Sequence, residues 1–188
     1  MERVTQRAVS FFIKYGGAKE TDSDLYEYGI IICLSTIINL TITFIVGFVV
    51  GMPSLLLVFL IPYLLIRSFA GGYHAKTFWG CVLISSVIVI AVVLLLYYIP
   101  AVLYFPFTGL LLIQSGVIIF RFAPAVSTNR RIEVEKYGMM KVRAFCVLGM
   151  VILACLWLFL FGAMQHMFSV SLGVGFASVT LLFCRRKL

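Results

Sequence analysis

Six long apolar segments constrain the fold of this chain more than any other feature of its sequence. They cover residues 28–50, 53–70, 82–99, 101–120, 144–161 and 167–183. A helix needs about 20 residues to cross the roughly 30 Å hydrocarbon core of a bilayer, and each segment is close to that length. The segments are rich in Leu, Ile, Val and Phe without strict alternation, so they favour membrane-spanning helices over the strands of a β-barrel.

The composition leads to the same class of protein. Of the 188 residues, 63% are hydrophobic and 12% are charged, whereas a soluble domain is about half apolar and about a quarter charged. These values exclude a soluble enzyme, a nucleic-acid-binding protein and a disordered tail. We therefore predict an all-α polytopic membrane protein of about six transmembrane helices, organised as a single domain over residues 1–188 with its helical bundle over 28–183. The short segments 53–70 and 167–183 are expected to tilt, to thin the bilayer or to stop partway across it.

The distribution of basic residues predicts the orientation. Lysine and arginine occur in the N-terminal region, around the links that follow segments 53–70 and 101–120, and in the C-terminal tail. The other three links carry no basic residue. Because basic residues are retained on the cytoplasmic side, we expect a multi-pass protein of the cell membrane with both termini in the cytoplasm.

Two further segments are expected at the cytoplasmic face. Residues 1–24 predict an amphipathic interfacial helix, with Val4 and Phe11 on its apolar face and Arg3 and Lys14 on the opposite face. Residues 121–143 predict a basic cytoplasmic loop. Both segments are expected to be attracted to anionic membrane lipid.

One segment does not fit a plain bundle of apolar helices. It lies between two short apolar segments and combines a cation, three glycines, a histidine and a cysteine: Arg67, Gly71, Gly72, His74, Gly80 and Cys81. Polar and ionisable side chains near membrane depth are functional candidates. Glycines favour an interruption of the helix, so we predict a broken or re-entrant element over residues 67–81.

His74 and Cys81 are the candidate catalytic pair. On an uninterrupted helix they would be about 10 Å apart along the axis, whereas a proton transfer needs a contact of about 3 Å. A broken element would let His74 fold back and take the thiol proton, which makes the sulfur a nucleophile. The alternative for His74 is that it caps a helix end. Arg67 either reaches the lipid headgroups, or it holds an anion or orients the loop.

The remaining polar residues leave several interpretations open. The other four cysteines are expected to be small buried hydrophobes, and no disulfide framework, metal-ligand spacing or cofactor motif is present in the sequence. Four side chains are candidates to orient His74 or to form an oxyanion hole, as are backbone amides near Gly80: Ser68, Ser85, Ser86 and Gln114. A small-solute or peptide transporter is the alternative function, with a path lined by polar residues such as Asn39, Thr41, Thr43, Gln114 and Ser115.

The pattern Arg67-x-x-x-Gly71-Gly72-x-His74-Ala75, followed by Cys81, resembles the signature of the accessory gene regulator B (AgrB) family. These proteins are membrane cysteine peptidases of Gram-positive quorum-sensing and virulence systems. The length, the six apolar segments and the Phe122-Ala123-Pro124-Ala125 start of a basic loop are also similar to the family pattern. Family loops often carry a second proline soon afterwards, which this chain replaces with other residues.

The resemblance implies a function. Cys81 would be the nucleophile and His74 its base, and together they would cleave the acidic C-terminal tail from an AgrD-like precursor peptide. The resulting thioester would be attacked by a thiol or hydroxyl of the precursor, which closes a thiolactone or lactone ring. Arg67, Gly71, Gly72 and Gly80 would orient the loop or bind substrate. In the basic loop the candidate substrate-binding residues are Pro124, Arg130, Arg131 and Lys136. No nucleic acid is expected as a partner, and a homodimer is expected because small bundles with short spans often associate.

Overall fold

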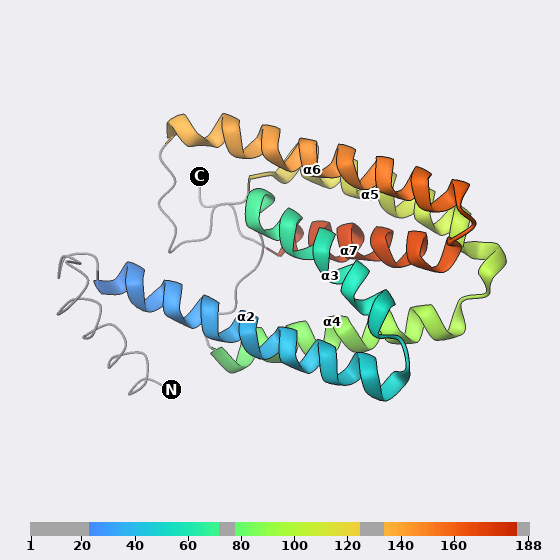
Figure 1. Ribbon diagram of the computed structural model, residues 1–188. Coiled ribbons are helices and arrows are strands. Elements are labelled where there is room, and N and C mark those ends of the chain that lie inside the picture. The colour runs from blue at the N-terminus through green and yellow to red at the C-terminus, as the bar shows by residue number, and fades with distance from the viewer. Residues whose placement is uncertain (1–22, 72–77, 125–133, 184–188) are drawn as a thin grey trace.

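The computed structural model describes residues 23–71, 78–124 and 134–183, and its long regular elements there are α-helices (Figure 1). They are α2 (Ser23–Val50), α3 (Pro53–Ala70), α4 (Phe78–Tyr98), α5 (Tyr104–Phe122), α6 (Val134–Leu160) and α7 (Met164–Leu182), with a short 3-10 helix, η2 (Ala101–Leu103), before α5. The predicted all-α architecture is confirmed for these residues. The predicted amphipathic helix over residues 1–24 lies outside the described residues except at its end, where α2 has already begun.

All six helices contain a stretch long and apolar enough to cross a membrane. The stretches are Gly29–Val50, Pro53–Ala70, Phe78–Tyr98, Ala101–Phe122, Gly138–Leu160 and Met164–Leu182. The six apolar segments of the sequence are therefore confirmed as six helices. The main difference is that α4 and α6 start earlier than their apolar segments, because helix formation does not stop where the hydrophobic run stops.

The helix ends form two groups, which lie at opposite ends of the bundle (Figure 1). At one end, short links join α2 to α3, α4 to α5 and α6 to α7. We call the opposite end the basic end, because the basic side chains that the structure describes lie in the helix turns nearest to it: Arg67, Arg121, Lys141 and Arg143. The asymmetry of charge in the sequence is thus an asymmetry between two ends of the folded bundle.

Helix α7 occupies the centre of the bundle, where it packs against α3, α5, α6 and α4 (Figure 1). Buried residues make up 67% of its membrane-length stretch, against 11% for α2. The sequence interpretation that 167–183 would tilt or stop partway missed this position. The segment has the lowest mean hydropathy of the six because it contains small polar residues. In the bundle these residues face other helices rather than lipid.

Side-chain hydroxyls connect α7 to its neighbours. Ser169 Oγ donates to the backbone oxygen of Leu55 in α3 at 2.6 Å, and Ser178 Oγ donates to Ser115 Oγ in α5 at 3.2 Å. Small and hydroxyl-bearing residues let membrane helices approach closely and bond to each other, since lipid offers no hydrophobic drive between apolar helices. The core of this protein is therefore a close-packed, partly polar contact between helices.

The closest approach is between α3 and α7 at Gly173. A Cβ atom added at Gly173 would lie 2.4 Å from the backbone oxygen of Phe59 and 2.7 Å from Cγ of Pro62. Pro62 lies inside α3, where its ring removes one backbone hydrogen bond and crowds the preceding turn. Glycine at 173 provides the space for this irregular part of α3, so the position of α3 depends on α7.

The outer surface of the bundle is apolar, with aromatic residues towards both ends. Tyr97, Tyr98 and Trp157 are exposed towards the end with short links, and Trp79 and Phe120 are exposed towards the basic end. Aromatic side chains gather at the two interfaces of a bilayer, where an apolar ring with a polar edge is favoured. The surface is therefore that of a protein surrounded by lipid.

The predicted loop over 121–143 is shorter in the structure. Helix α5 continues through Phe122, and α6 begins at Val134, so Lys136 is part of a helix. With 27 residues, α6 is about 40 Å long, which exceeds the roughly 30 Å apolar core. Its basic first turns therefore extend past the apolar core at the basic end.

Candidate active site at the basic end

Cys81 lies in the first turn of α4, at the basic end of the bundle, and its side chain is partly exposed. The preceding helix α3 runs through Arg67 and ends at Ala70. Gly71 follows with a φ of 84°, a backbone conformation that favours glycine. The predicted broken element over 67–81 is thus helical at both of its ends, since Arg67 belongs to α3 and Gly80 and Cys81 belong to α4. Gly72 and His74 lie outside the described residues.

The described cysteines occupy different environments. Cys33 and Cys146 are exposed on α2 and α6, and Cys155 is buried with its thiol directed at the backbone oxygen of Met167, 3.9 Å away. Cys81 differs from these three because it lies in the first turn of its helix. Cys155 packs as a small core residue.

Arg67 is held by a tyrosine one turn earlier on α3. Its Nη1 donates a hydrogen bond to the Tyr63 hydroxyl at 3.2 Å, and its guanidinium carbon lies 5.9 Å from the centre of the Tyr63 ring. The ring of Tyr63 is buried and stacks on Phe59, with 5.4 Å between the ring centres. A guanidinium bonded in this way is directed by the protein rather than free to extend to any headgroup.

Tyr63 lies one helical turn before Arg67 on α3. Cys81 lies near the start of a different helix, α4, and the link between the two helices includes residues 72–77, which are outside the described residues. The sequence interpretation missed Tyr63, although its spacing of four residues from Arg67 is one at which helical side chains meet.

Two hydroxyls proposed for an oxyanion hole already use their hydrogens. Ser68 Oγ donates to the backbone oxygen of Leu64 at 2.8 Å, and Ser86 Oγ donates to that of Val82 at 2.9 Å. A serine hydroxyl has one hydrogen to donate, so these two cannot at the same time donate to a substrate oxygen.

Polar side chains considered for a transport path also bond within the bundle. Thr41 and Thr43 each donate to the backbone oxygen four residues earlier, at 2.9 and 2.7 Å. Ser115 donates to Leu111 at 2.6 Å and accepts from Ser178. Such contacts are typical of membrane helices. Thr43 and Ser115 are buried inside the bundle, whereas Thr41 is exposed on its surface.

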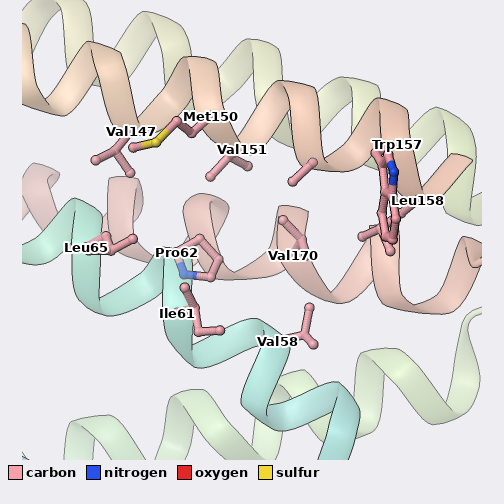
Figure 2. Close-up of a pocket in the computed structure, with 11 residues that line it drawn as sticks. Val58, Ile61, Pro62, Leu65, Val147, Met150, Val151, Trp157, Leu158 and Val170 are labelled. Atoms are coloured by element: carbon pink, nitrogen blue, oxygen red, sulfur yellow. The ribbon is translucent and has the colours of Figure 1, made fainter.

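A groove of about 330 Å³ lies between α3, α6 and α7 (Figure 2). Its walls are apolar and come from all three helices: Val58, Ile61, Pro62, Leu65, Val147, Met150, Val151, Ala154, Trp157, Leu158 and Val170. Neither Cys81 nor Arg67 lines it. The groove offers no group for bond cleavage, and the candidate chemistry lies at the basic end instead.

Several positively charged side chains lie at the basic end, two of them on α6. The Lys141 ammonium lies 5.0 Å from the centre of the Phe120 ring, and the Arg143 guanidinium contacts the sulfur of Met139 at 3.2 Å. Pro124 is buried at the end of α5, and Arg130 and Arg131 lie outside the described residues. The charged side chains that the structure describes at this end are positive, which favours the approach of an anionic partner.

Six apolar spans, of which the central one is rich in small residues, define a polytopic membrane protein with polar side chains at one end of its bundle. A model of the accessory gene regulator B family matches residues 5–181. The chain therefore belongs to this family.

One relative supports the assignment. A Clostridium perfringens protein (strain SM101 / Type A) described as AgrB-like is 24% identical over 145 residues, which cover 72% of this chain and 64% of the relative. The chain thus spans less than two thirds of the length of that relative. No solved structure matches the chain.

Proposed function

We propose that this chain is a membrane-embedded cysteine endopeptidase that removes the C-terminal tail from an AgrD-like precursor peptide and allows the remainder to cyclise. The observation that carries the proposal is the position of Cys81, which lies in the first turn of α4 at the basic end with its side chain partly exposed. Membership of the family supports it, since the family processes precursors of autoinducing peptides for quorum sensing.

The proposed reaction has two acyl transfers. His74 takes the Cys81 proton, and the sulfur attacks the carbonyl carbon between the signal segment and the tail. The C–N bond breaks, the amine of the tail takes up a proton and leaves, and a thioester to Cys81 remains. A thiol or hydroxyl of the precursor then attacks the carbonyl carbon of this thioester. The ring closes, the C–S bond to Cys81 breaks, and the Cys81 thiol is regenerated. Hydrolysis competes with ring closure, so a site beside the membrane that limits water suits the reaction.

The basic end is proposed to face the cytoplasm, with both termini on that side. The support is the positive charge gathered at one end of the bundle and the short uncharged links at the other. This orientation places Cys81 on the side where a newly made peptide and anionic lipid are found.

Trapping the covalent intermediate tests the proposal. Purified protein in liposomes receives a precursor whose ring-closing cysteine is replaced by alanine, so the thioester cannot be resolved by cyclisation. We expect the intact mass of the protein to rise by the mass of the acyl segment, and neutral hydroxylamine to reverse this rise because it cleaves thioesters.

Two results would contradict the proposal: an adduct mapped to a residue other than Cys81, and tail release with no adduct in acid-quenched samples at any time. The transporter alternative is tested with the same liposomes after they are loaded with a solute. It predicts that the solute crosses the membrane and that the precursor is not cleaved.

A second prediction concerns the basic residues after α5. Replacing Arg130, Arg131 and Lys136 together by glutamine is expected to raise KM for a precursor with an acidic tail by roughly three- to tenfold at low salt, without lowering kcat. The reason is a weaker long-range attraction, so the difference should shrink as salt is added. A precursor with Asn and Gln in its tail is the control, and an equal rise in KM for this neutral tail would rule out the electrostatic explanation.

A further inference from the structure

The groove between α3, α6 and α7 has a closed floor and an open outer side (Figure 2). Its floor is formed by buried side chains, among them Pro62, Val147 and Val151. On its rim, Ile61 of α3 and Met150 of α6 are more than half exposed. The groove is therefore cut into the lipid-facing surface of the bundle rather than enclosed inside it.

The groove lies at membrane depth and follows the direction of the helices. On α3 its lining residues run from Val58 to Leu65, in the middle of the membrane-length stretch Pro53–Ala70. On α6 they run from Val147 to Leu158, which corresponds to about 16 Å of helix. This length is about half of the roughly 30 Å hydrocarbon core, which is the share of one leaflet. The groove thus has the depth and the length of a lipid acyl chain.

A cation continues the line of the groove towards the basic end. Arg143 precedes Val147 by four residues and Met150 by seven, so these three side chains share one face of α6. Arg143 Nη2 donates to Met139 Sδ at 3.2 Å, one turn nearer to the basic end. The guanidinium therefore extends along α6 away from the groove, in the direction of the lipid headgroups.

The guanidinium of Arg143 has donors available for an anion. The side chain is exposed, and within residues 23–71, 78–124 and 134–183 its hydrogen-bonded contact is the one with Met139. A thioether sulfur is a weak acceptor, whereas arginine offers several N–H donors in a planar fork. Phosphate oxygens accept such a fork in pairs, so a phosphate group is a strong partner for this side chain.

We propose that the groove and Arg143 together form a binding site for one anionic phospholipid, with an acyl chain in the groove and the phosphate on Arg143. The arginine favours a negatively charged headgroup, and the groove fixes the position of the chain. A chain in the groove gains dispersion contacts with the floor and both walls, which a flat lipid-facing helix does not offer. The inference goes beyond the peptidase proposal and does not depend on it, because binding of the lipid involves no cleavage.

A second copy of this chain is the alternative occupant of the groove. Two copies inserted in the same orientation would bring their basic ends to the same side of the membrane. Contact through the groove would then place the two Arg143 side chains near each other, and like charges oppose such a contact. An anionic headgroup is attracted to the same position. The charge beside the groove therefore favours lipid.

Photo-crosslinking in liposomes tests the site. The full chain is placed in phosphatidylcholine with a small fraction of phosphatidylglycerol that carries a diazirine in one acyl chain. After illumination, the labelled peptides are mapped by mass spectrometry, and we expect label on the groove side of α6, at residues such as Met150 and Ala154. The anionic probe should label the groove about fivefold more than a phosphatidylcholine probe with the same chain, since a basic residue at the membrane surface contributes about 1 kcal/mol.

Two variants separate the headgroup contact from the chain contact. Arg143→Gln should remove the preference for the anionic probe and leave labelling by the phosphatidylcholine probe unchanged. Its matched control is Lys141→Gln, which removes a charge from the same end of α6 but from a side chain that lies over the Phe120 ring. Ala154→Trp places a large ring in the groove and should lower labelling by both probes. Leu156→Trp should not, because two residues further on the side chain lies on the opposite, exposed side of the helix.

Three results would overturn the proposal. Survival of the anionic preference in Arg143→Gln would remove the headgroup contact. Label spread evenly over the lipid-facing sides of the helices would show that no lipid is held in the groove. Absence of label from the groove would exclude lipid as its occupant, and a dimer that Ala154→Trp converts into a monomer would then identify a second copy in its place.

Discussion

Replacement of Cys81 by alanine is expected to abolish tail release from the precursor peptide, with a fall of roughly 10⁴-fold or more in the rate of cleavage. The physical reason is that the sulfur is the atom that bonds to the scissile carbonyl, so no other effect of the site can act without it. The measurement is co-expression with the precursor, followed by mass spectrometry of the released tail and of the cyclic product. His74→Ala is expected to give a loss of similar kind, since the thiol then lacks its base.

Two other cysteines serve as controls for this result. Cys33 and Cys146 are exposed on the apolar outer surface of α2 and α6, so Cys33→Ala and Cys146→Ala should cleave at the wild-type rate. Cleavage that survives in Cys81→Ala but disappears in either control would assign the nucleophile to another position and end the present interpretation of the site.

Replacement of Gly173 by alanine is expected to be the most damaging small change to the fold. The added Cβ would meet the backbone oxygen of Phe59 at 2.4 Å and the ring of Pro62 at 2.7 Å, so α3 and α7 must move apart. Overpacking of this kind costs about 1–3 kcal/mol and occasionally more. We expect a lower melting temperature and less monodisperse protein in detergent.

Two other glycines provide graded controls for Gly173→Ala. A Cβ at Gly149 of α6 meets nothing within 4 Å, so Gly149→Ala should leave the melting temperature unchanged or raise it slightly. At Gly175 the nearest atom is Cδ2 of Leu111, at 2.8 Å, and this flexible side chain can move. Gly175→Ala should therefore lie between the two. Equal melting temperatures for all three variants would show that the α3–α7 contact does not limit stability.

The number and type of the helices could be read from the sequence because they depend on local properties. Twenty or so apolar residues in a row must form a helix in lipid, whatever their neighbours do. The position of α7 could not be read in this way. Its serines and glycines lower its hydropathy and suggest a poor span, but in the bundle they become the surface on which α3 and α5 pack.

The residues of the candidate site also fall into those that the sequence reveals and those that only the structure reveals. Arg67 and Cys81 were found because a cation and a thiol stand out in an apolar chain. Tyr63 did not stand out, since a tyrosine among nine tyrosines in a membrane protein carries no local signal. Only the helical register that places its hydroxyl on Arg67, and the burial of its ring against Phe59, give it a distinct environment.

The sequence by itself determined the membrane class, the six spans and the concentration of charge around particular links, since each follows from the free energy of placing single residues in lipid or water. The tertiary structure decided which helix lies at the centre and where the backbones of α3 and α7 touch. These features depend on contacts between residues far apart in the chain. Their energies arise only when the helices pack together, so no stretch of sequence contains them alone.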